Sequence, residues 1–113
     1  MAAKKTADEL SRESLELARQ AQQLRQVVRG LAKRIAQLQR ELDVAEREAR
    51  LRAAAYYADA GVMLRDQERY AQDSRKQQAE IDSKKQTLAD AKQKLEDLQE
   101  QARKAGISAS QLD

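Results

Sequence analysis

The chain has 113 residues, a formal net charge of +3, 36% charged side chains, and neither Cys nor His. It therefore lacks thiolate nucleophiles, imidazole ligands and the side chain that most often moves protons at neutral pH, so we expect no enzyme, no metal site and no cofactor. The sequence shows no secretory leader and no apolar run of about 18 residues. We therefore expect a cytoplasmic protein without membrane insertion.

Composition leaves two structural classes open, a disordered chain and long helices. Leu, Ile, Val and Phe make up only 20 of the 113 residues, close to the level at which chains fail to fold. On the other hand, Pro is absent, Gly occurs three times, and Ala, Leu, Glu, Gln, Lys and Arg dominate, as in coiled coils. The spacing of the apolar residues decides in favour of helices.

The first predicted helix covers residues 7 to about 58. Thr6 and Glu9 have the spacing of a capping box, which places the start of the helix near Ala7. Apolar residues then repeat every seven positions in two interleaved series, Leu10, Leu17, Leu24, Leu31 and Leu38 with Ala21, Val28, Ile35 and Leu42. This a/d heptad pattern predicts a coiled coil.

The segment YYADAGVML at residues 56–64 is the most distinctive stretch of the chain. Asp59 and Gly61 favour a turn over about 59–62. Tyrosines provide a large contact area with few rotatable bonds, so we expect a partner-binding tip. Its residues would be Tyr56, Tyr57, Val62, Met63 and Leu64. The alternative interpretation is that these side chains pack on one another and close the turn.

The second predicted helix covers residues 63 to about 105. A weaker heptad series runs through it, with Ile81, Leu88, Leu95 and Ala102 seven apart and Ala91 and Leu98 between them. Gly106 followed by Ile107 predicts a helix end with a C′ glycine and an apolar residue that folds back. The rest of the tail, over 106–113, is expected to fray.

Together the two helices predict an all-α fold in which residues 1–113 form a single domain, an antiparallel two-helix coiled-coil hairpin. Layers of such a pair have residue numbers with a constant sum, and Leu38 with Ile81, like Leu24 with Leu95, adds to 119. The midpoint lies beside Gly61. The layers are apolar near the termini and polar toward the turn, so packing should loosen there. The alternative is one long rod, because a single Gly inside a helix costs only about 1 kcal/mol.

Two packed helices leave both flanks of their interface exposed, which favours self-association. Leu15, Val27, Val44 and Leu51 lie outside the a/d positions and widen the apolar face. We therefore expect a homodimer with a four-helix arrangement.

Charge is segregated along the first helix. Between Glu16 and Glu41 there is no acid, and six cations form a possible polyanion stripe, namely Arg19, Arg25, Arg29, Lys33, Arg34 and Arg40. No aromatic residue lies among them to stack on bases, so nucleic acid is not the expected partner. The leading hypothesis is a non-enzymatic coiled-coil structural or adaptor protein that mediates protein–protein interaction or assembly. The alternative is a weak, salt-sensitive binder of nucleic acid or another polyanion through this stripe.

Overall fold

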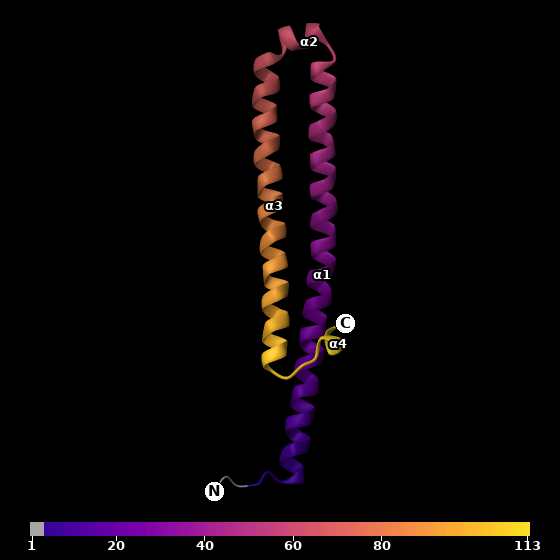
Figure 1. Ribbon diagram of the computed structural model, residues 1–113, viewed down its shortest axis with the longest axis vertical. Coiled ribbons are helices and arrows are strands. Elements are labelled where there is room, and N and C mark those ends of the chain that lie inside the picture. Colours follow the sequence, from indigo (N-terminus) through magenta and orange to yellow (C-terminus); the bar gives the residue numbers. More distant parts are fainter. Residues whose placement is uncertain (1–3) are drawn as a thin grey trace. The chain divides into compact units, whose positions relative to one another are not determined.

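A computed structural model describes residues 4–113 of the protein, and it is all-α: 90% is helical, and the described residues contain no strand. The helices are α1 (Ala7–Tyr57), α2 (Ala60–Arg65), α3 (Gln67–Lys104) and α4 (Ala109–Leu112) (Figure 1). The contacts divide the chain into two compact units, unit 1 (Met1–Lys33 with Gln93–Asp113) and unit 2 (Arg34–Lys92). Across residues 4–113, none of the helices combines the length and the apolar character that crossing a membrane requires.

The start of α1 confirms the predicted capping box. The Glu9 N–H donates to Thr6 Oγ1 at 3.2 Å, and the Thr6 N–H donates to Glu9 Oε2 at 3.4 Å. These two bonds satisfy amide groups that the first turn of a helix leaves without a partner. The helix therefore begins at Ala7, as the sequence indicates.

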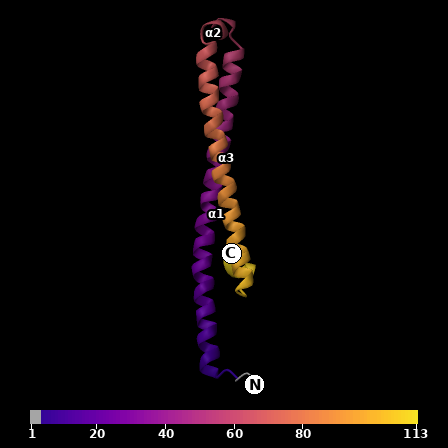
Figure 2. The same ribbon diagram turned by 90° about the vertical axis from the view of Figure 1, so that its left-hand side faces the viewer.

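In unit 2, α3 lies beside α1 and runs in the opposite direction (Figures 1 and 2). Its core contains the buried residues Leu38, Leu42 and Ala45 of α1 and Ile81 and Leu88 of α3. Most residues that lose solvent exposure recur at steps of three or four, at 35, 38, 42, 45, 49, 53 and 56 in α1 and at 70, 74, 77, 81, 84, 88 and 91 in α3. The positions predicted to be apolar and inward-facing in this unit are therefore the least exposed ones.

The connection between α1 and α3 differs from the predicted turn over 59–62. Asp59 is the N-cap of α2, and its Oδ1 accepts hydrogen bonds from the Gly61 N–H at 2.9 Å and the Val62 N–H at 3.2 Å. A short Asp side chain in this position favours helix initiation over a reverse turn. Residues 60–62 are consequently the first turn of α2, which ends at Arg65, and α3 begins only at Gln67.

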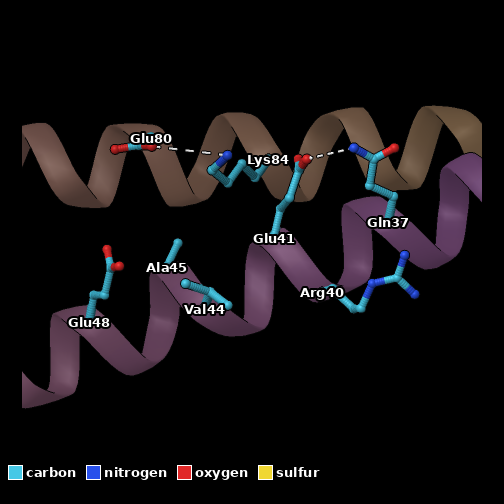
Figure 3. A pocket seen from close by; sticks show the side chains of 8 residues that line it. All are labelled: Gln37, Arg40, Glu41, Val44, Ala45, Glu48, Glu80 and Lys84. Carbon is cyan, nitrogen blue, oxygen red and sulfur yellow. Dashed lines mark hydrogen bonds and ion pairs between the residues drawn. The ribbon is translucent and has the colours of Figure 1, made fainter.

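This longer connection shifts the pairing of the helices by one heptad at the tip. The rings of Tyr56 and Tyr70 stack at 3.8 Å between centroids and 4° between planes. Their residue numbers add to 126, seven more than the predicted 119, which would have placed Ala49 opposite Tyr70. Figure 3 likewise shows Ala45 below the stretch of α3 between Glu80 and Lys84.

The shift changes one layer that was predicted to be polar, while residues 46–80, closer to the tip, are all half-buried or exposed, in line with the looser packing expected there. Ala45 is buried although its predicted neighbour was the polar Ser74. In the observed register it lies near the level of the buried Ile81, so an apolar layer forms where a polar one was expected. The Lys84 side chain, only 28% exposed, covers part of the same region with its methylenes while its ammonium lies 4.0 Å from Glu80.

In unit 1, the end of α3 is a Schellman motif. Gly106 has φ +82°, the Ile107 N–H donates to the Ala102 carbonyl at 2.9 Å, and the Gly106 N–H donates to the Arg103 carbonyl at 3.1 Å. Ile107 then packs against Ala102 in a buried cluster. The predicted C′ glycine and the apolar residue that folds back are both confirmed.

The residues after Gly106 correct the prediction of a frayed tail. Ile107 is 3% exposed and Leu112 is 6% exposed, and both pack with Ala21 and Ala102. Between them the Ser108 N–H donates to Gln111 Oε1 at 2.8 Å, which closes the first turn of α4. Two buried aliphatic side chains give this short segment the apolar contacts that an exposed terminus lacks.

Candidate functional site

The tip surface consists of the five residues predicted for partner binding, and unit 2 brings them together around the connection. Tyr56 and Tyr57 end α1, while Val62, Met63 and Leu64 belong to α2. Tyr56, Val62 and Met63 are half-buried. Tyr57 and Leu64 project into solvent with 66% and 85% of their surface exposed. The structure thus divides the predicted site into supporting and exposed residues.

Tyr56 and Tyr70 form the support beneath the exposed residues. Tyr56 stacks on Tyr70, and Tyr57 approaches both rings edge-on, at 5.1 Å from Tyr56 and 5.9 Å from Tyr70. The Tyr56 hydroxyl donates to the Met63 carbonyl oxygen at 3.3 Å, which ties α2 to the end of α1. Tyr56 therefore closes the connection, as the alternative interpretation of this segment proposed.

Tyr70 is the member of this cluster that sequence reasoning missed. The predicted register placed it opposite Ala49, away from the other two rings. The available signal was that it is the third and last Tyr of a chain without Phe or Trp. With the other two it lines an open groove of about 510 Å³, together with Met63, Leu64, Gln67, Ala71 and Ser74.

The environment of Tyr56 changes its acidity. Burial among its neighbours raises the pKa of the Tyr56 phenol above its ordinary value of 10.0, and the proximity of Tyr57, Tyr70 and Asp66 adds to the effect. Because the folded state favours the neutral phenol, its contribution to stability is present below pH 10 and is lost as the pH rises through the higher folded value.

We therefore expect the Tyr56 phenol to ionise above its ordinary pKa of 10.0 in the folded protein. Absorbance at the phenolate band during an alkaline titration measures this, with circular dichroism recorded alongside to follow folding. Tyr56→Phe should remove a phenol that ionises above the ordinary pKa of 10.0. An alkaline titration in which the phenol lost in this variant ionises at or below that value would contradict the assignment.

The cations of the predicted polyanion stripe are partly engaged within the chain. In unit 1, Arg19 lies 2.6 Å from Glu16, and its hydrogen bond holds the pKa of the Glu16 carboxyl below the ordinary value. Arg25 Nε donates to the Gln111 carbonyl oxygen at 2.8 Å, and Arg29 Nη2 donates to the Asp113 backbone oxygen at 2.9 Å. The remaining stripe residues are exposed: Lys33 in unit 1, and Arg34 and Arg40 in unit 2.

A groove of about 340 Å³ between α1 and α3 in unit 2 includes one stripe residue, Arg40 (Figure 3). It is lined by Gln37, Arg40, Glu41, Val44, Ala45, Glu48, Glu80 and Lys84. Three carboxylates face two cations there, and Gln37 donates to Glu41 at 3.2 Å. A groove with this balance does not select a polyanion.

Comparison of the chain with protein-family models, curated proteins and solved structures finds no match. Within residues 4–113, no group of three or more His, Cys, Asp and Glu side chains is arranged to hold a metal ion. Among the large hydrophobic side chains exposed in the described residues, Tyr57 and Leu64 belong to the tip surface.

Proposed function

We propose that this protein is a non-enzymatic structural or adaptor protein that recognises another protein through its tip surface. In this proposal α1 and α3 form an antiparallel coiled-coil hairpin that self-associates into a homodimer in the cytoplasm. The observation that carries the proposal is the exposure of Leu64 and Tyr57 beside the stacked rings of Tyr56 and Tyr70. Large apolar side chains held in a fixed position favour recognition, because little conformational freedom is lost on binding.

The division of roles within the tip surface supports this proposal further. Tyr56 stabilises the connection, because its ring stacks on Tyr70 and its hydroxyl donates to the Met63 carbonyl oxygen. Leu64, by contrast, is 85% exposed and gains little from folding. Aromatic and aliphatic anchors that fill a partner's pocket often supply most of the binding energy of an interface. Recognition should therefore depend on Tyr57 and Leu64, and folding on Tyr56 and Tyr70.

We expect the double change Tyr57→Ser and Leu64→Ser to leave helicity and the melting midpoint nearly unchanged and to abolish partner capture. Circular dichroism and affinity capture from a lysate measure the two effects. Val44→Ser with Leu51→Ser is a matched control, because both residues are exposed aliphatics of unit 2 outside the tip surface. The control should capture the same partner as the wild type.

Two other outcomes would contradict the proposal. Early melting of the tip variant would mean that Tyr57 and Leu64 serve to close the connection. Normal folding with unchanged capture would place the binding surface elsewhere. Repeating the capture across a salt series tests the polyanion alternative, because phosphate contacts weaken steeply with salt whereas apolar contacts do not.

A further inference from the structure

We propose that a second copy of this chain packs in parallel against the part of α1 that belongs to unit 2, along the side that carries Val44 and Leu51. This side is called the pairing face, and it consists of residues 37, 40, 41, 44, 47, 48, 51, 54 and 55. The proposal rests on the self-association included in the proposed function, and it identifies the surface and the orientation of the two copies. It does not involve the tip surface.

The centre of the pairing face is a column of exposed apolar side chains. Val44 and Leu51 are seven residues apart in α1, and they are 52% and 63% exposed. They lie outside the core of unit 2, to which α1 contributes Leu38, Leu42 and Ala45. Aliphatic side chains at heptad spacing form the stripe on which a second helix packs. Because α3 leaves these two side chains exposed, the column is open to another helix.

Opposite charges lie on the two sides of the apolar column. Figure 3 shows Glu41 extending toward α3 and Arg40 on the side of α1 away from α3, with Val44 between them. Glu48 and Arg47 follow one heptad later and are exposed. Glu41 and Glu48 therefore form an acidic edge of the pairing face, and Arg40 and Arg47 form a basic edge.

A twofold axis parallel to the helices makes the pairing face complementary to itself. Such an axis places each residue of the apolar column opposite the same residue of the second copy, and the acidic edge of each copy beside the basic edge of the other. Arg47 of one copy then lies beside Glu48 of the other, and this pair forms twice. Antiparallel pairing would instead bring the two acidic edges together and the two basic edges together. Charge therefore selects a second copy in parallel orientation.

The groove of about 340 Å³ between α1 and α3 offers a site for the arginines of the second copy. Three carboxylates line it, those of Glu41, Glu48 and Glu80. Of the two cations that line it, Lys84 lies 4.0 Å from Glu80, and Arg40 lies on the side of α1 away from α3 (Figure 3). The basic edge of the second copy supplies guanidinium groups, which bind carboxylates through two parallel hydrogen bonds. The groove is thus complementary in charge to the second copy.

Charge and side-chain size also set the extent of the interface. Toward the end of α1 the edges contain Ala54 and Ala55, whose small side chains allow two helices to approach closely. One heptad before Arg40 and Glu41 the corresponding residues are Lys33 and Arg34, which would bring cations of both copies together. We therefore expect contact over residues 37–55, roughly 27 Å at about 1.5 Å per residue. An interface of this length is small for a specific complex, so the dimer should dissociate on dilution.

Parallel pairing has a consequence for the proposed recognition of a partner. The tip surfaces of the two copies lie at the same end of such a dimer. A partner with two binding sites is then held by both, which strengthens its binding without any new contact. A single copy still carries one tip surface, so recognition itself does not require the dimer.

Sedimentation equilibrium of the intact chain over a range of concentrations tests the proposal. Leu51→Ser should weaken self-association at least tenfold. Arg47→Glu and Glu48→Arg should each have an effect of this size, because either change places like charges together across the twofold axis. Arg75→Glu is the matched control, because Arg75 is an exposed arginine of α3 outside the pairing face and the groove, and it should leave self-association unchanged.

A mixture of the two charge variants shows whether these residues face each other between copies. When an Arg47→Glu chain pairs with a Glu48→Arg chain, every acidic side chain at this level again lies beside a basic one. The mixture should therefore associate as tightly as the wild type, although each variant alone does not. Circular dichroism of each variant should match that of the wild type, because both residues are exposed.

Orientation is tested with spin labels at Gln37, an exposed residue at one end of the pairing face. In a parallel dimer the two labels lie at the same level. In an antiparallel dimer they would be separated along the helices by roughly 27 Å, from nine residues on each side of the midpoint at about 1.5 Å each. A separation of that size would overturn the parallel arrangement.

The remaining outcomes distinguish this proposal from the proposed function. A chain that stays monomeric at every concentration would overturn both self-association and the pairing face. A dimer that is insensitive to Leu51→Ser, that responds equally to Arg47→Glu and Arg75→Glu, or that does not re-form in the mixture would overturn the pairing face alone. Loss of partner capture in the tip variant with unchanged self-association would leave the pairing face supported, because the two surfaces share no residue.

Discussion

Replacing Leu38 by Ala is expected to lower the free energy of unfolding by about 2–5 kcal/mol, the range for buried leucines generally. Leu38 is 4% exposed in the core of unit 2, and its removal leaves a cavity beside Ile81 and Leu88 that neighbouring backbone cannot fill. Urea unfolding followed by circular dichroism measures the loss. The effect is large because so few aliphatic side chains are fully buried in this unit.

Leu51→Ala is the matched control for this change. Leu51 belongs to the same helix and the same unit, but 63% of its surface is exposed, so we expect a loss within about 0.5 kcal/mol. A comparable loss at Leu38 and Leu51 would mean that the core of unit 2 does not lie at its least exposed residues.

Changing single glycines to alanine should shift stability in opposite directions at Gly106 and Gly30. At Gly106, φ is +82°, and a side chain in this left-handed region costs about 1–2 kcal/mol. At Gly30, within α1, an added Cβ meets nothing within 4 Å, and Ala favours the helix by about 1 kcal/mol. Gly106→Ala should therefore destabilise the protein and Gly30→Ala should stabilise it.

Urea unfolding of both glycine variants measures the two shifts under one set of conditions. An added Cβ would meet nothing within 4 Å at either position, so only the backbone conformation distinguishes the two glycines. Destabilisation by Gly30→Ala as well would indicate that α1 requires flexibility at that point.

The helices and their inward faces could be predicted because both follow from local chemistry. The capping box at Thr6 starts α1, and the glycine at position 106 ends α3, each through bonds to residues fewer than six positions away. The periodicity of apolar residues then identifies the positions that lose solvent exposure. None of these inferences needs knowledge of how distant segments meet.

The register at the tip could not be predicted because heptads repeat. A shift of seven residues places every inward-facing position opposite another inward-facing position, so the series itself cannot exclude it. The choice depended on Asp59, which is equally suited to a turn and to the N-cap that it forms for α2. The stack of Tyr56 on Tyr70 depends on this register, so it could not be predicted either.

The packing of the tail, residues 106–113, was missed for a different reason. A segment with two aliphatic residues among small polar ones is predicted to fray, because its stability comes from the surface that it contacts rather than from its own sequence. That surface includes Arg25 and Arg29, more than 80 positions earlier in the chain. The same two residues were attributed to a polyanion stripe, which shows how readily a cation with an internal partner is taken for a ligand site.

The steps of three or four between inward-facing residues along α1 and α3 in unit 2 also limit how the chain can change in length. Removing a single residue from either helix would rotate everything beyond it by about 100° and turn the inward face toward solvent. Removing seven residues from α1 and the seven facing them in α3 would preserve both the layers and the ring stack. In homologous proteins, insertions and deletions in this part of the chain should therefore occur as pairs of heptads, one in each helix.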